Sequence, residues 1–255
     1  MRRRSIIAEA AFWLASLSLA AAFAVLAVWT SRAYYLPGDR AVTFGVQDLY
    51  RYGWADGFFE QANRAGDVWV LSIVFGVLAS LLAVRSHFLA AAIVVVAGLT
   101  QLVPAGLSAA MQRPEDQYVA MRAAFDGLLH PRIYPSPGGF PSGHVFAEVL
   151  AYGLVIWLAG RVLPLLLTLP LRAACVAAIA AGFLAPLYAG AHWFTDVLGG
   201  AVLALLVLML AWRADRALRR ERQLVRIEDL LGSERVPSPA ARGRVEREPT
   251  DALSR

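Results

Sequence analysis

The chain has 255 residues, of which 58% are hydrophobic and only 17% are charged. A soluble domain of this length could not bury so much apolar surface, so the composition excludes an ordinary water-soluble protein and indicates a membrane protein. All 24 basic residues are arginine, and the net charge is +5. The arginines do not form a basic face with interleaved aromatic residues, so no nucleic-acid partner is expected.

Apolar residues are grouped in six blocks, each close to the length that crosses a bilayer. We therefore predict an all-α, polytopic fold with six transmembrane helices. Their expected ranges are Ala11–Thr30, Val68–Val84, Phe88–Met111, His144–Gly160, Leu171–Ala191 and Val197–Trp212. The first block follows Met1-Arg2-Arg3-Arg4 but is too long for a typical secretion signal, so we interpret it as an uncleaved anchor. The lone Cys175 offers neither a disulfide nor a metal cluster.

Arginine placement predicts the orientation of these helices, because cytoplasmic loops of membrane proteins carry an excess of basic residues. With the N-terminus in the cytoplasm, the inner side collects Arg2, Arg3, Arg4, Arg85, Arg161, Arg172 and the arginine-rich tail. Arginines in the outer loops are balanced by acidic residues. The expected location is the inner or plasma membrane, with both termini in the cytoplasm and membrane lipids as neighbours.

Two segments outside the blocks differ from them in composition: an outer segment rich in aromatic residues and a tail rich in arginine. The outer segment Ser31–Asp67 carries aromatic residues near helical spacing and predicts one or two short helices. These helices could lie on the membrane surface with aromatic side chains at headgroup depth, or pack as a cover over the spans. Residues 1–215 form the expected six-helix domain, and residues 216–255 form an arginine-rich cytoplasmic tail in which disorder is expected from about residue 232.

The first candidate site is Pro141-Ser142-Gly143-His144, where a loop rich in proline and glycine ends and the fourth block begins. Ser142 is a good N-cap, and the free N–H groups of the first helical turn favour an anion. A plain N-cap with an incidental histidine is the alternative. Glu148 lies four residues after His144; it could hold His144 and favour its protonated form, or be a buried acid bonded to a neighbouring helix.

The second candidate site is His192, four residues before Asp196. On one helix the two side chains would share a face, and the carboxylate would fix the imidazole tautomer. A structural pair that ties two helix ends is the alternative. Arg113, His144 and His192 all fall on the predicted outer side of the membrane. Two imidazoles, a carboxylate, an arginine and a helix N-terminus at one depth suit phosphoryl transfer.

In their order and spacing, three motifs make the chain resemble a known family over roughly residues 40–212. The motifs are Arg113-Pro114, Pro141-Ser142-Gly143-His144 and His192-x-x-x-Asp196. The family is that of the type-2 phosphatidic acid phosphatases, relatives of the vanadium haloperoxidases.

The resemblance implies a role for each matching residue. His192 is expected to be the nucleophile that forms a phosphohistidine, and Asp196 to orient it. His144 is expected to be the general acid for the leaving group and then the base for water. Phosphate binding is expected from Arg113, Ser142 and the Gly143 N–H. The resemblance implies no metal and no other cofactor.

The chain departs from the family's motifs at two places. Gly106 stands where the first motif begins with a lysine, and Ala185-Pro186 stand where the third motif has Ser-Arg. Two expected phosphate-binding cations are therefore missing, and one arginine clamp can be worth on the order of 10³–10⁵ in rate. Arg122 and Arg132, in the loop before the fourth block, are candidates to supply replacement charge.

These observations predict an integral membrane phosphatase that hydrolyses a lipid phosphate or pyrophosphate monoester at the extracytoplasmic face. A non-hydrolytic lipid-phosphate binding or transport protein on the same scaffold is the alternative. The missing cations favour the binder, whereas two histidines and a carboxylate favour the enzyme, because binding alone needs cations more than a nucleophile and an acid. A purely structural membrane protein would not explain the clustering of these polar residues.

Overall fold

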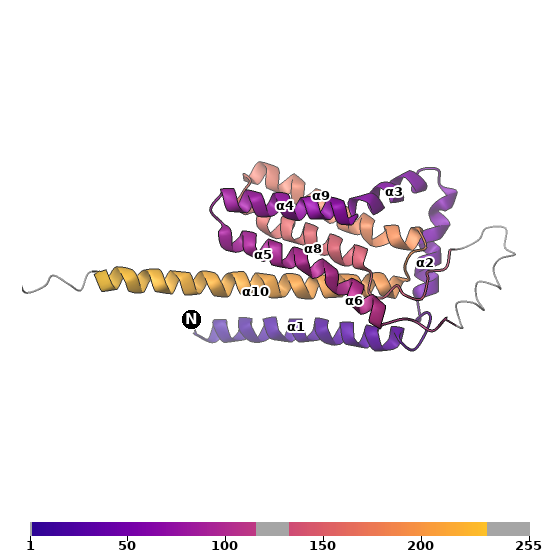
Figure 1. Cartoon of the computed structure of the whole chain (residues 1–255), viewed down its shortest axis with the longest axis horizontal. Helices are drawn as coiled ribbons and strands as arrows, with labels where there is room; N and C mark the ends of the chain where they lie inside the picture. Colours follow the sequence, from indigo (N-terminus) through magenta and orange to yellow (C-terminus); the bar gives the residue numbers. More distant parts are fainter. Residues whose placement is uncertain (1, 116–132, 234–255) are drawn as a thin grey trace, which may run out of the picture. The chain divides into compact units, whose positions relative to one another are not determined.

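The computed structural model describes residues 2–115 and 133–233, and within these residues the chain is all-helical with no strand (Figure 1). Arg122, Arg132 and nearly all of the tail expected to be disordered lie outside the described residues. The chain divides into two compact units, Met1–Arg213 and Ala214–Arg255. The candidate site lies in the first unit.

The N-terminal half of the first unit contains α1 (Arg2–Thr30), α2 (Asp39–Gln47), the 3-10 turn η1 (Asp48–Arg51), α3 (Ala55–Ala65), α4 (Val68–Val84), α5 (Phe88–Leu99), η2 (Thr100–Leu102) and α6 (Val103–Ala110). The C-terminal half contains α8 (Gly143–Leu158), η3 (Ala159–Arg161), α9 (Leu165–Tyr188) and α10 (Phe194–Ser233), which continues into the second unit.

The six predicted spans are confirmed as helices long and apolar enough to cross a membrane, one of them only in combination with a neighbour. Five qualify alone: Ile7–Thr30, Phe88–Ala110, Gly143–Arg161, Leu165–Tyr188 and Phe194–Gln223. The sixth, α4, qualifies together with α3, to which it is joined at a 50° bend. The span Phe88–Ala110 is interrupted by η2 just before α6. Pro104 lies in the first turn of α6, where its missing N–H costs no helical hydrogen bond.

Helix α8 is at the centre of the first unit. It packs against α4, α5 and α9, and 61% of its span is buried, compared with 11% to 33% for the other four single-helix spans. Leu150, Leu154 and Leu158 recur every four residues on its buried face and have no exposed area. In Figure 1, α8 accordingly lies between α5 and α9. Residues at the N-terminus of α8 are thus held by neighbours on several sides.

Helices α2 and α3 pack over α9, so the cover is the arrangement that the structure supports for the outer segment. Ala55, Phe59 and Ala62 of α3 are buried together with Ala185 of α9. The opposite face of this segment exposes Tyr52, Trp54 and Phe58. Amphipathic packing therefore fixes α2 and α3 on the helix that leads into the second candidate site.

Candidate active site

The N-terminus of α8 begins where the sequence predicted, with Ser142 as its N-cap. The Ser142 side chain accepts a hydrogen bond from the Val145 N–H, at 3.4 Å. The N–H of Ser142 donates to the Asp196 carbonyl at 2.9 Å, so the start of α8 is tied directly to the first turn of α10. Ser142 itself is fully buried, whereas Gly143 is partly exposed, which leaves the first N–H of the helix near the surface of the site.

Two glycines of α10 allow this close approach. A Cβ on Gly200 would lie 2.4 Å from the Ser142 carbonyl oxygen, and one on Gly199 would lie 2.4 Å from the Phe140 ring. Real side chains do not tolerate such distances, so the loop before α8 can meet α10 only because both positions lack a Cβ. The glycines thus bring the two candidate sites, about fifty residues apart in sequence, into contact.

The continuous helical register considered for His192 and Asp196 is not present in the structure. Helix α9 ends at Tyr188, and Gly190 adopts a left-handed conformation with φ of 65°. The N–H groups of Gly190 and Ala191 then donate to the carbonyls of Leu187 and Pro186, at 3.1 and 2.9 Å, which is the Schellman pattern of a helix end. His192 lies in the turn that follows, and Asp196 lies in the first turn of α10.

Side chains of α2 and α10 satisfy the free N–H groups at the start of α10. The Trp193 N–H donates to Asp196 Oδ2 at 2.9 Å, the Phe194 N–H to Thr43 Oγ1 at 3.2 Å, and the Thr195 N–H to Asp39 Oδ1 at 2.8 Å. Asp39 and Thr43 are four residues apart on α2, so one face of that helix provides two of the three acceptors. The turn that carries His192 is thereby fixed to α2.

His144 and His192 line a single cavity of about 330 Å³. It is bounded by the start of α4, by α6, by the first turns of α8 and by the α9–α10 turn. The polar groups that reach it are His144, His192, Gln101, Ser108 and the backbone at Gly139 and Gly143; the remaining lining is apolar. None of the described lining residues is an arginine. Two imidazoles in one cavity of this size can act on one small group such as a phosphate.

His192 lies close to Asp196 but is not hydrogen-bonded to it. The distance from His192 Nδ1 to Asp196 Oδ2 is 3.9 Å, too long for a hydrogen bond, and Nδ1 has no hydrogen-bond partner among the described residues. Gly139 lies against both groups: a Cβ there would be 2.9 Å from Asp196 Oδ2 and 3.2 Å from His192 Nδ1. With Nδ1 turned toward the carboxylate, Nε2 is the nitrogen available for chemistry.

His144 packs against the backbone of Gly66, at the bend between α3 and α4. A Cβ on Gly66 would lie 2.1 Å from His144 Nε2. The Tyr152 hydroxyl, two turns further along α8, donates to the Ala65 carbonyl at 3.0 Å and holds the same bend against α8. His144 Nε2 is buried and has no hydrogen-bond partner within the described chain.

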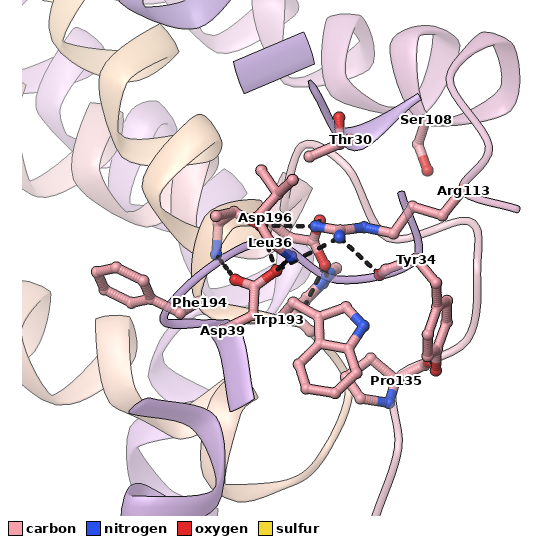
Figure 2. Close-up of polar contacts among 12 residues, drawn as sticks. Thr30, Tyr34, Leu36, Asp39, Ser108, Arg113, Pro135, Trp193, Phe194 and Asp196 are labelled. Atoms are coloured by element: carbon pink, nitrogen blue, oxygen red, sulfur yellow. Dashed lines mark hydrogen bonds and ion pairs between the residues drawn. The ribbon is translucent and has the colours of Figure 1, made fainter. Parts of the chain in front are cut away.

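Arg113, expected to bind phosphate, does not reach the cavity. Its guanidinium has no exposed area and lies between two carboxylates (Figure 2). Nη2 donates to Asp196 Oδ1 and to Thr195 Oγ1, both at 2.7 Å, while Nη1 donates to the Tyr34 carbonyl at 2.7 Å and faces Asp39 Oδ2 at 3.4 Å. Two acidic partners hold the guanidinium behind Asp196 rather than in front of the histidines.

Glu148 makes neither of the hydrogen bonds considered from sequence. It is buried on α8, and neither carboxylate oxygen has a hydrogen-bond partner within residues 2–115 and 133–233. The carboxylate instead fills the space left by Gly182 of α9, where a Cβ would lie 1.7 Å from Glu148 Oε2. The structure therefore gives no contact through which Glu148 would hold His144.

The fold and these motifs agree with a known family. The model of the PAP2 superfamily matches residues 88–220, a segment that contains Arg113, Ser142, His144, His192 and Asp196. The chain belongs to the PAP2 superfamily. Its fold is similar to that of the first transmembrane PAP2 type phosphatidylglycerolphosphate phosphatase from Bacillus subtilis, with a TM-score of 0.54 and 21% sequence identity over 79% of this chain and 96% of that one. No curated protein matches the chain significantly in sequence.

The structure describes both places at which the chain departs from the PAP2 motifs. Pro186 is buried in the last turn of α9, and its carbonyl accepts the hydrogen bond that closes the Schellman pattern. Its neighbour Ala185, at the place of the motif's serine, is buried in one cluster with Phe59 of α3. Gly106, at the place of the motif's lysine, lies in open space, because a Cβ there would meet nothing within 4 Å.

Asp39, Thr43 and Gly66 belong to the site but were not found from the sequence. All three lie before the segment that matches the PAP2 model. Burial raises the pKa of Asp39 above its usual value, while hydrogen bonds from Leu36 and Thr195 and the charge of Arg113 oppose that rise. Asp39 and Thr43, spaced by one turn in an outer segment, were a weak signal for a helix cap, but only the fold reveals which helix they cap.

Proposed function

We propose that this member of the PAP2 superfamily is an integral membrane phosphatase that hydrolyses a lipid phosphate or pyrophosphate monoester through a phosphohistidine on His192. Superfamily membership and the shared transmembrane fold support a lipid phosphatase in general. The observation that carries the finer proposal is that His144 and His192 line one cavity, with Asp196 behind His192 at 3.9 Å.

In the first step, Nε2 of His192 attacks the phosphorus atom, the bond to the ester oxygen breaks, and His144 donates a proton to that departing oxygen. In the second step, His144 takes a proton from water as the water attacks phosphorus, and the bond between phosphorus and His192 breaks. Inorganic phosphate leaves and both histidines return to their starting states. Asp196 stabilises the positive charge that His192 carries in between.

The phosphate oxygens would be held mainly by neutral donors. The Gly143 N–H at the start of α8 lies at the cavity, and a helix N-terminus favours an anion there. Ser142 would act by capping α8 rather than by direct contact, because it is fully buried. Arg122 and Arg132 remain candidates for auxiliary charge, and the Arg122→Ala and Arg132→Ala variants would test them through phosphate release.

A lipid is the favoured substrate because the rest of the cavity lining is apolar and the site lies at the ends of candidate spans. The arginine distribution supports an extracytoplasmic position for this end of the spans, in the inner or plasma membrane. Among residues 2–115 and 133–233, no three His, Cys, Asp or Glu side chains could together hold a metal ion. The proposed mechanism uses no metal, and activity in a chelator tests that feature.

The experiment is phosphate release by purified protein from phosphatidic acid, phosphatidylglycerophosphate and a polyprenyl pyrophosphate, in detergent with EDTA. Glycerol phosphate is the soluble comparison, and His192→Ala is the control. We expect release from at least one lipid, and His192→Ala to lose at least about a hundredfold of it. Wild type that binds these lipids but releases no more phosphate than His192→Ala would favour the binding or transport protein instead.

A further inference from the structure

Asp39, at the start of α2, is a buried carboxylate that receives three hydrogen bonds from two residues. Its Oδ2 accepts from the Leu36 N–H at 2.8 Å and from Thr195 Oγ1 at 3.0 Å, and its Oδ1 accepts from the Thr195 N–H at 2.8 Å. Thr195 Oγ1 in turn accepts from Arg113, so its own proton is directed to Asp39. Every contact of Asp39 is therefore a donor, which is the environment of an ionised carboxylate.

Arg113 connects Asp39 to Asp196. Its guanidinium bonds Asp196 Oδ1 at 2.7 Å with one nitrogen and faces Asp39 Oδ2 at 3.4 Å with the other, and all three side chains have no exposed area (Figure 2). Asp196 uses its second oxygen for the Trp193 N–H and lies 3.9 Å from His192 by that same oxygen. The series of contacts from Asp39 through Arg113 to Asp196 thus leads to His192, the proposed nucleophile.

The net charge of this group of side chains depends on Asp39. Two carboxylates and one guanidinium leave one net negative charge behind His192. Without Asp39, the guanidinium would neutralise Asp196 alone, and His192 would face a pair with no net charge. Charges interact strongly in a buried site, so this difference in net charge changes how well the site stabilises His192 when it becomes positive during the reaction.

We infer that Asp39 is a positioning residue: it holds and partly neutralises Arg113, so that Asp196 keeps both its orientation and its effective negative charge toward His192. The inference rests on the proposed phosphatase function. It also gives Arg113 a role behind the nucleophile in place of direct phosphate binding. Asp39 lies outside the segment that matches the PAP2 model, so it follows from the structure rather than from the resemblance.

The test compares Asp39→Asn, Arg113→Gln and the double variant Asp39→Asn/Arg113→Gln in detergent. Glu60→Gln on α3, an exposed carboxylate paired with Arg64, is the control. Asp39→Asn is expected to lower kcat about tenfold or more and to leave KM within about twofold, by analogy with residues that orient a reacting group from behind. Because removing Arg113 as well restores the charge on Asp196, the double variant should be faster than Asp39→Asn.

Binding of orthovanadate, which mimics phosphorus under attack, provides a readout that needs no turnover. Asp39→Asn should lower the affinity for orthovanadate about tenfold and the affinity for inorganic phosphate less than twofold. The double variant should recover part of the orthovanadate affinity. Three outcomes would overturn the inference. Asp39→Asn could lower the affinity for both anions equally, or leave orthovanadate affinity unchanged, or the double variant could bind orthovanadate more weakly than both single variants. A wild type that binds orthovanadate as described but releases no phosphate would contradict the proposed function and not the role of Asp39.

Discussion

Gly139 lies so close to Asp196 that a Cβ at position 139 would be 2.9 Å from Asp196 Oδ2. The same atom would be 3.2 Å from His192 Nδ1. The loop before α8 therefore closes over the His192–Asp196 pair, and the backbone of Gly139 sets how far the imidazole and the carboxylate can move. This contact joins the two halves of the proposed catalytic machinery.

Gly139→Ala should consequently lower kcat by at least about tenfold, because displacing a reacting group by a fraction of an ångström is costly. The neighbouring Gly138→Ala is a matched control, since a Cβ at Gly138 meets nothing within 4 Å. Steady-state phosphate release and the melting temperature of both variants would be measured. Equal kcat for the two variants would show that the proximity of Gly139 to His192 has no catalytic consequence.

Gly66→Ala should disable His144 with little loss of stability. The new methyl group would overlap His144 Nε2, so the imidazole would have to leave its present position. We expect kcat to fall on the order of a hundredfold, the size usual for loss of a general acid. Gly57→Ala, on α3 and in open space, should retain full activity. A fully active Gly66→Ala would mean that His144 does not need its present position.

Glu148→Met should leave activity within about twofold and stabilise the protein. Both Glu148 oxygens are buried without a partner in the described chain, and an unsatisfied buried polar group costs about 1–3 kcal/mol. Methionine has similar length and no polar atom to satisfy. Thermal unfolding in detergent and kcat over a range of pH would be compared with Glu148→Gln. A large drop in kcat, or a changed pH profile, would restore the alternative in which Glu148 supports His144.

Thr43→Val should destabilise the start of α10. It keeps the shape of Thr43 but removes the hydroxyl that accepts from the Phe194 N–H, which at a helix N-terminus is worth about 1 kcal/mol. Thr43→Ser, which retains the hydroxyl, should remain within a few tenths of a kcal/mol of wild type. Denaturant unfolding monitored by tryptophan fluorescence would separate them, and identical midpoints would mean that the cap contributes nothing.

Much of the fold could be predicted from sequence because hydropathy alone defines the spans. The helix start at Ser142 was also predictable, since an N-cap is a local property of a loop rich in proline and glycine. The same local chemistry was overlooked at Gly190, whose left-handed conformation ends α9 and separates His192 from the helix that carries Asp196. A glycine a few residues before His192 was the signal for that break.

The environment of Arg113 could not be predicted in the same way. Its partners Asp39 and Asp196 lie 74 and 83 residues away, and nothing local to Arg113 indicates that two carboxylates surround it. Whether a cation faces the substrate or a buried acid depends on long-range packing. The resemblance to the family supplied the motif residues, and the fold supplied their neighbours.

Trapping the covalent intermediate tests the central claim most directly. Purified protein would be mixed with a lipid phosphate labelled with ³²P in its phosphate group, quenched in alkali, digested and sequenced by mass spectrometry. The account predicts an alkali-stable, acid-labile phosphoryl group on His192, absent from His192→Ala and longer-lived in His144→Ala. Phosphate release with no label on His192, or undiminished release by His192→Ala, would contradict it.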